Sequence, residues 1–108
     1  MLRVSLRRVN PDLLDQLRDW FRTVNRARRS EAIATLADEG CRHEQAYLLS
    51  DSDGPLLLYV MEVEDIERSR HTVQGSPHPI DLDHRQVMTQ ALGESLELEL
   101  ILDLLPDS

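Results

Sequence analysis

Residues 41–63, with the sequence CRHEQAYLLSDSDGPLLLYVMEV, decide the fold of this chain. Between two segments that each contain a run of apolar residues, Ser50–Pro55 consists only of Ser, Asp, Gly and Pro. These four residue types favour turns. The stretch therefore predicts a strand over Cys41–Leu49, a turn, and a second strand over Leu56–Val63, paired as a hairpin.

The segment before the hairpin predicts a strand followed by a helix. Leucine and valine alternate with polar residues from Leu2 to Arg7, and a period of two is typical of a half-buried strand. Asn10-Pro11 favours a helix start, and Gly40 favours its end. A straight helix of this length would overhang a small sheet, so we expect a bend or a break near Arg28–Ser30.

The segment after the hairpin predicts two helices and a last strand. Asp65–Val73 has the composition of a short helix, and Gly75-Ser76-Pro77 ends it. A second helix is expected from Pro79 to about Leu92. Leucines then alternate with Glu97, Glu99, Ile101 and Asp103, so a strand is expected over Leu96–Leu104.

This order of elements predicts one α+β domain over residues 1–108. A β-α-β-β-α-β order is typical of the ferredoxin-like fold, with a four-stranded antiparallel sheet and the helices on one face. The alternation places an aliphatic set toward the helices: Leu2, Val4, Leu6, Ala46, Leu48, Leu56, Leu58, Val60, Leu98, Leu100 and Leu102. The mixed set on the other face is costly to expose, so we expect a homodimer to cover it: Arg3, Arg7, His43, Gln45, Tyr47, Tyr59, Met61, Glu97, Glu99 and Ile101.

Charge and composition exclude several classes of function. The chain has 20 acidic and 12 basic residues and a net charge of -8, which disfavours nucleic acid and anionic membrane surfaces as partners. One cysteine and no apolar leader segment favour a cytoplasmic protein. No Gly-rich phosphate loop is present, so we expect no nucleotide and no other cofactor.

The segment Ser76–Arg85, SPHPIDLDHR, holds the residues that most favour catalysis. Imidazole titrates near neutral pH, so His84 or His78 would be an acid or base, with Asp81 orienting the ring of His84. His84 and Asp81 are i, i+3 neighbours on the expected helix. His84 also falls in the apolar stripe of that helix, which turns it toward the sheet.

Two other interpretations of this segment stay open. Pro79 at the first helical position makes His78 the N-cap. The negative charge of Asp81 in the first turn then interacts favourably with the helix dipole, and neither residue has a role in catalysis. A metal site would need His78, Asp81 and His84, with His43 or His71 as a fourth ligand. Because i, i+3, i+6 spacing fans around a helix, we expect no metal at these residues.

A second candidate site lies on the expected open face of the sheet. His43, Tyr47, Tyr59, Arg3 and Glu99 would project from neighbouring strands toward a small polar ligand. A few polar groups on an apolar lining are the usual form of a small-molecule pocket. The alternative is that the arginines and glutamates of this face form interface ion pairs and bind no ligand.

The chain resembles a family of small prokaryotic proteins of unknown function in the dimeric α+β barrel superfamily. The resemblance rests on Gly40-Cys41, Tyr59–Glu62, the helix that contains Arg70, and above all Ser76–Asp81 with His84 after it. It implies the fold and dimerisation, and no particular reaction, because that superfamily supports many chemistries.

Two functional hypotheses follow from these residues. In the first, the protein binds a small polar molecule and catalyses a cofactor-free proton transfer such as isomerisation or epimerisation, with His84 as the acid or base. In the second, it is a non-enzymatic dimeric binding or scaffold module, and the polar residues serve helix caps and the interface.

Overall fold

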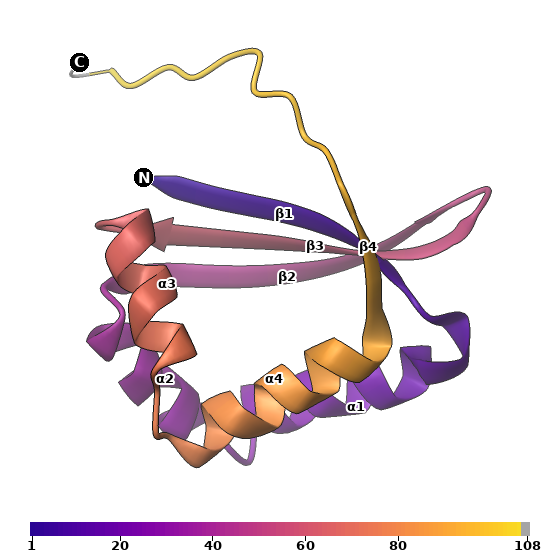
Figure 1. Ribbon diagram of the computed structural model, residues 1–108, viewed down its shortest axis with the longest axis horizontal. Coiled ribbons are helices and arrows are strands. Elements are labelled where there is room, and N and C mark those ends of the chain that lie inside the picture. The colour runs from indigo at the N-terminus through magenta and orange to yellow at the C-terminus, as the bar shows by residue number, and fades with distance from the viewer. Residues whose placement is uncertain (107–108) are drawn as a thin grey trace.

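The computed structural model describes residues 1–106 and shows an α+β fold with one sheet and four α-helices (Figure 1). The antiparallel sheet has the strand order β2-β3-β1-β4, with β1 at Leu2–Val9, β2 at Cys41–Asp51, β3 at Gly54–Val63 and β4 at Leu92–Leu96. The helices are α1 at Leu14–Asn25, α2 at Arg29–Asp38, α3 at Ile66–Gln74 and α4 at Pro79–Ala91. A 3₁₀ turn, η1 at Pro11–Leu13, precedes α1. The α+β class and the four-stranded antiparallel sheet are as the sequence predicts.

The first helical segment begins and breaks close to the expected positions. The side chain of Asn10 accepts a hydrogen bond from the backbone N–H of Asp12, and Pro11 follows at the first helical position. The segment breaks at residues 26–28 into α1 and α2, which confirms the expected break. Gly40 then has a φ of +67°, a left-handed conformation that favours glycine between α2 and β2.

The predicted hairpin of β2 and β3 is confirmed, with a tighter turn than expected. The two strands pair from Cys41↔Val63 to Asp51↔Gly54, and only Ser52-Asp53 lies between them. Asp51 accepts a hydrogen bond from the backbone N–H of Asp53, and the guanidinium of Arg8 donates two to the same carboxylate, at 2.7 and 2.9 Å. These contacts fix the hairpin end against β1.

The helices lie together on one side of the sheet, and the register shows which side chains face them (Figure 1). On β1 and β3 the prediction is wrong: Arg3, Arg7, Leu57, Tyr59 and Met61 face the helices. On β2 the alternation is predicted correctly, with Ala46 and Leu48 toward the helices. The open face therefore carries an apolar set, which includes Leu2, Val4, Leu6, Leu58 and Val60.

The reason for this error is the uninterrupted apolar run in β3. Residues 55–61 are Pro, Leu, Leu, Leu, Tyr, Val and Met, so both faces of β3 are apolar and the pattern does not choose between them. Aromatic contacts determine which face of β3 meets the helices, because the ring of Tyr59 packs against Phe21 of α1 and His84 of α4 with centroids about 6 Å apart. The register with β3 then determines which face of β1 meets the helices, since Ser5 pairs with Tyr59.

The last strand also differs from the prediction. β4 begins directly after α4 and ends at Leu96, where the expected strand would begin. Its pairing to β1, Leu6↔Leu96 and Val9↔Leu92, stops there, and residues 97–105 leave the sheet on the side away from the helices (Figure 1). Leu98, Leu100 and Leu102 are 47–78% exposed and do not meet the helices. β1 continues to Leu2, so the early end of β4 leaves residues 2–5 of β1 unpaired on this side, and the leucine pattern does not show where the pairing stops.

The main core lies where α1 and α4 cover the sheet. Val9, Leu17, Leu57 and Ala91 are buried together there, and a smaller cluster of Cys41, Met61 and Val63 lies at the other end of β3. Within residues 1–106, no helix combines the length and apolarity needed to cross a membrane.

A matched pair of leucine variants tests this packing. Leu17 of α1 is 0% exposed in the core, whereas Leu82 of α4 is 50% exposed. Leu17→Ala is expected to lower the free energy of unfolding by about 3 kcal/mol, because it leaves a cavity. Leu82→Ala is expected to change it by about 0.5 kcal/mol or less. Urea unfolding of both variants measures the difference, and equal losses would contradict the packing described here.

Candidate functional site

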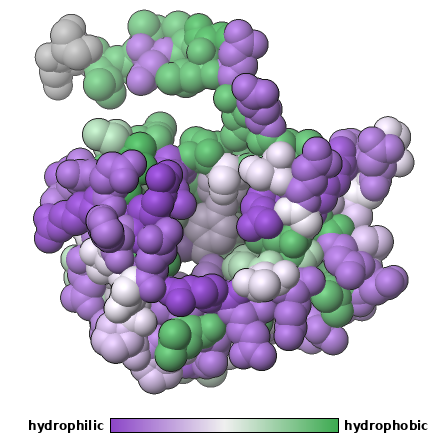
Figure 2. Space-filling model, viewed as in Figure 1, coloured by the Kyte–Doolittle hydropathy of each residue, from purple (hydrophilic) through white to green (hydrophobic). Residues whose placement is uncertain are grey.

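A cleft of about 930 Å³ lies between the helix-facing side of the sheet and the helices. Arg3, Glu44, Tyr59 and Met61 line it from the sheet, and α1, α2 and α4 close the other side. Figure 2 shows a hollow near the centre of the face it presents, between polar surfaces. The cleft separates the main core from the smaller cluster and brings residues from both ends of the chain together.

His84 is held in the cleft by the indole of Trp20. The Nε1–H of Trp20 donates a hydrogen bond of 2.8 Å to Nδ1 of His84, so Nδ1 is the acceptor and Nε2 carries the proton of the neutral ring. Burial lowers the pKa of His84, which keeps the ring neutral at pH 7. Its remaining edge therefore presents a hydrogen-bond donor. In this arrangement the ring is no base, because its lone pair is already occupied by Trp20.

Tyr59 and Glu44 form the floor of the cleft. Ala46 of β2 lies opposite Tyr59 and Glu44 lies opposite Met61, so the two polar side chains point the same way, and the hydroxyl of Tyr59 donates to Glu44. Burial raises the pKa of Glu44, although the hydrogen bond from Tyr59 opposes that rise. Burial and the nearby carboxylate raise the pKa of Tyr59, so its hydroxyl keeps its proton.

Glu39 is the most perturbed carboxyl group of the cleft. It follows α2, is buried, and lies 3.5 Å from the hydroxyl of Ser69, which donates to it. Burial, and then the charges of Glu44 and Asp81, raise the pKa of Glu39 to about 7. A carboxyl group of this kind both gives and takes a proton at neutral pH, which is the property required of a general acid or base.

The Ser76–Arg85 segment is ordered by contacts around the start of α4. His78 is the N-cap and Pro79 the first helical residue, as the sequence predicts. The hydroxyl of Ser76 donates to Asp81 at 2.5 Å and accepts from the backbone N–H of His78, while Nε2 of His78 contacts Asp38 at 2.7 Å. Asp81 lines the cleft, and its side chain accepts a hydrogen bond from Ser76. The expected partner of His84 was Asp81, but the ring of His84 is bound by Trp20 instead.

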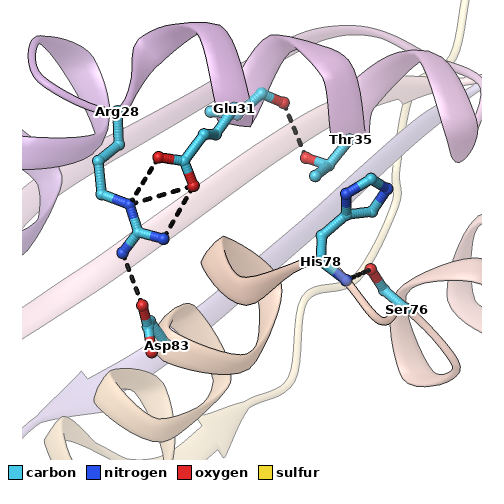
Figure 3. A network of polar contacts seen from close by, with 7 residues as sticks. Arg28, Glu31, Thr35, Ser76, His78 and Asp83 are labelled. Atoms are coloured by element: carbon cyan, nitrogen blue, oxygen red, sulfur yellow. Dashed lines mark hydrogen bonds and ion pairs between the residues drawn. The ribbon is translucent and has the colours of Figure 1, made fainter.

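An arginine outside the cleft fixes the helices that form its wall. Arg28, between α1 and α2, donates to Glu31 of α2 at 2.9 Å and to Asp83 of α4 at 2.6 Å (Figure 3). The two carboxylates raise the pKa of Arg28 further above its ordinary value. Its guanidinium also lies over the ring of Trp20, at 5.6 Å from the centroid. Arg28 thus holds the same indole that holds His84.

The structure brings some of the expected site residues together and separates others. The residues that line the cleft include His84, Asp81, Tyr59 and Arg3, and also His43 and Tyr47, although Arg3 and Tyr59 were expected on the open face. The side chain of Tyr47 is exposed on that open face, where its hydroxyl donates to Gln45.

Three other expected residues lie away from the centre of the cleft. A bulge between Cys41 and His43 pairs His43 with Glu62, and His43 is exposed. Glu99 lies in the C-terminal segment near Leu2 and Val4, far from His84 in the fold. His78 remains at the N-cap of α4. In residues 1–106, no group of three or more His, Cys, Asp or Glu side chains is arranged to hold a metal ion.

Sequence reasoning missed Glu39, Glu44, Ser69 and the role of Trp20. Two of them had a usable signal. Glu44 shares a face of β2 with Ala46 and Leu48, which were correctly predicted to face the helices. The same alternation therefore predicts that the carboxyl group of Glu44 faces the helices. Trp20 lies in the apolar stripe of its helix, and a buried indole N–H needs an acceptor. Glu39 and Ser69 meet only through the tertiary fold, since 30 residues separate them.

A family model described as a family of unknown function (DUF6176) matches residues 2–108. The chain belongs to this family. No curated protein matches the chain at a significant level. Membership of this family of unknown function assigns no reaction to the cleft.

The pKa of Glu39 predicts a pH dependence of stability. Its pKa is about 7 in the folded chain and 4.5 ordinarily, so between these values the folded state binds more protons than the unfolded state. Stability is then lost as the pH rises from about 4.5 to 7. Glu39→Gln removes this loss, and relative to wild type it should gain on the order of 3 kcal/mol between pH 4.5 and 8.

Urea unfolding of wild type and Glu39→Gln across this pH range measures the difference. Glu67→Gln, which changes an exposed carboxylate of α3, controls for the loss of one negative charge. Parallel pH profiles of wild type and Glu39→Gln would contradict the assignment.

Proposed function

We propose that this DUF6176 protein is a small homodimer of ferredoxin-like topology, a dimeric α+β barrel, that binds a small polar molecule in the cleft and transfers a proton on it without a cofactor. The observation that supports the proposal best is the convergence of Glu39, Glu44, Tyr59 and His84 on one cleft between the sheet and the helices. Strand order and directions are those of a ferredoxin-like sheet, which supports the topology.

The chemistry divides between a proton carrier and a hydrogen-bond donor. Glu39 takes a proton from a carbon next to a carbonyl group of the substrate, and the electron pair moves onto the carbonyl oxygen. Nε2–H of His84 is the donor suited to that oxygen, because Trp20 occupies Nδ1 and the neutral ring keeps its proton on Nε2 at pH 7, whereas the hydroxyl of Tyr59 already donates to Glu44. Return of the proton to the same or a neighbouring carbon completes an epimerisation or isomerisation with no net oxidation.

A non-enzymatic binding or scaffold module is the second candidate. It is favoured by the contacts at the start of α4, where His78, Asp81 and Ser76 each have a partner within the chain. On this interpretation the polar residues near α4 only order the helix start, and the cleft binds a ligand without changing it.

The homodimer is supported by the open face of the sheet. Leu2, Val4, Tyr47 and Leu49 are all exposed there, on the side of the sheet that no helix covers. A contiguous apolar surface of this kind on a small domain favours association. The same face of a second copy is the proposed cover, because it presents the same residues.

Val4→Glu tests the dimer, because it adds a charge to the centre of the proposed interface. Sedimentation equilibrium of wild type should give twice the mass of the 12.4 kDa chain, and Val4→Glu should give a monomer. Leu82→Glu, a matched change on the exposed side of α4, should stay dimeric. A monomeric wild type, or an unaffected Val4→Glu variant, would contradict the proposal.

Deuterium exchange tests the proposed reaction. Sugars, sugar acids and small aromatic acids that raise the unfolding midpoint are incubated with the protein in D₂O, and NMR follows loss of their C–H signals. Wild type should exchange one C–H position of a bound compound, and Glu39→Gln should slow this by about 100-fold or more with binding retained. Glu67→Gln is the control.

A ligand with a C–H next to a carbonyl group that binds without exchange, or exchanges equally well with Glu39→Gln, would refute proton transfer by Glu39. Binding without exchange in every case would favour the non-enzymatic module.

A further inference from the structure

The charges that line the cleft are opposite to those of the chain as a whole. The chain has 12 basic and 20 acidic residues, yet six arginines and only three acidic residues line the cleft. The arginines are Arg3, Arg7, Arg18, Arg22, Arg29 and Arg42; the acidic residues are Glu39, Glu44 and Asp81. An acidic protein thus places half of its cations around one cleft.

All three acidic residues of the cleft already have hydrogen-bond donors from the chain. Ser69 donates to Glu39, Tyr59 to Glu44 and Ser76 to Asp81. None of the three is bound by an arginine through an ion pair among residues 1–106. The charge of Arg3 opposes the rise in the pKa of Glu39, but the arginines around the cleft form no ion pair with its carboxylates in residues 1–106.

Four of the six arginines are bound elsewhere. Arg7 donates to the carbonyl of Gly93, Arg22 to Asp19 and Arg29 to Asn25, while Arg42 lies 3.8 Å from Glu64. For Arg3 and Arg18, the described part of the chain, residues 1–106, supplies no side-chain hydrogen bond and no ion pair. Arg3 is half-buried in β1, and Arg18 is exposed on α1.

Arg3 lies in the same row of the sheet as Glu44. Both pair with Met61 of the strand between them, so their Cα atoms are about two strand spacings, roughly 10 Å, apart. The next row holds Tyr59, whose ring leads toward Phe21 and His84. At one side of the floor, the guanidinium of Arg3 therefore has no side-chain hydrogen bond or ion pair within residues 1–106, and its charge acts on Glu39, the proposed proton carrier.

A half-buried guanidinium favours a planar anion, because its N–H groups match the two oxygens of a carboxylate. We infer that the ligand of the cleft is a small organic acid whose carboxylate is bound by Arg3, with Arg18 attracting it at the mouth. This inference rests on the proposed function and names its substrate class. A single negative charge fits better than a phosphate dianion, since three acidic side chains line the same cleft.

Two matched sets of compounds test the inference by isothermal titration calorimetry. One set is benzoate, benzamide, benzylamine and phenyl phosphate; the other is lactate and lactamide. Carboxylates should bind wild type at least tenfold more tightly than their amides, and the amine and the phosphate should bind more weakly than benzoate. Raising the salt concentration should weaken binding, because the attraction is electrostatic.

Arg3→Gln should weaken carboxylate binding by about 10- to 100-fold. Arg26→Gln, which removes the same charge from the turn after α1 and outside the cleft, should leave binding within about twofold of wild type. Arg3→Lys keeps the charge and loses the planar fork, so it should fall between the two. If circular dichroism shows that Arg3→Gln does not fold, binding is measured with Arg3→Lys and Arg18→Gln instead.

The outcomes separate this inference from the proposed function. Tighter binding of the amide, the amine or the phosphate, or carboxylate binding indifferent to Arg3→Gln, would overturn the inference and leave proton transfer by Glu39 standing. Lactate binding that depends on Arg3, with no exchange of its Cα–H for deuterium, would support the inference and contradict the proposed reaction. Absence of binding by every compound of both sets would contradict both.

Discussion

The hydrogen bond from Trp20 to His84 is the contact on which the rest of the arrangement depends. It joins α1 to α4, and it places the ring of His84 against Phe21 and Tyr59, with centroids about 6 Å apart. Arg28 packs on the other side of the indole and binds both α2 and α4. Because a polar group this deep needs a partner, the two rings fix each other's positions.

The position of this contact explains why a cleft exists. Toward β4 the helices close on the sheet through Leu17, Val9 and Ala91, and an apolar core results. Toward the N-terminal end of β1 the helix-facing side chains are Arg3 and Glu44, which need water or polar partners. The aromatic cluster stands between the two regions. Burial in this part of the fold raises the pKa of Glu39 and lowers that of His84.

Much of the fold could be predicted from the sequence. Turn residues between two strand-like segments placed the hairpin, and Asn10-Pro11 and His78-Pro79 placed two helix starts, because these signals are local. The facing of β1 and β3 could not be predicted, since leucines on both sides of β3 satisfy either choice. The leucine alternation after Leu96 predicted a strand, but the chain leaves the sheet there although residues 2–5 of β1 are still available for pairing.

The candidate site was predictable in part for the same reason. His84 falls in the apolar stripe of α4, and that stripe correctly turned it toward the sheet. Its partner could not be found from spacing, because Trp20 is 64 residues away. Asp81, three residues away, was the expected partner and is bound to Ser76. Local spacing therefore identified the histidine, whereas only the packing of α1 on α4 shows that its ring is a donor.

The tautomer of His84 tests the account most directly. Long-range ¹H–¹⁵N correlation spectra at pH 7 should show a proton on Nε2 and none on Nδ1, and Trp20→Phe should abolish this preference. Tyr47→Phe, which removes a hydroxyl from the open face, should leave the spectrum unchanged. A protonated Nδ1 in wild type, or a charged ring at pH 7, would contradict the arrangement of the cleft described here.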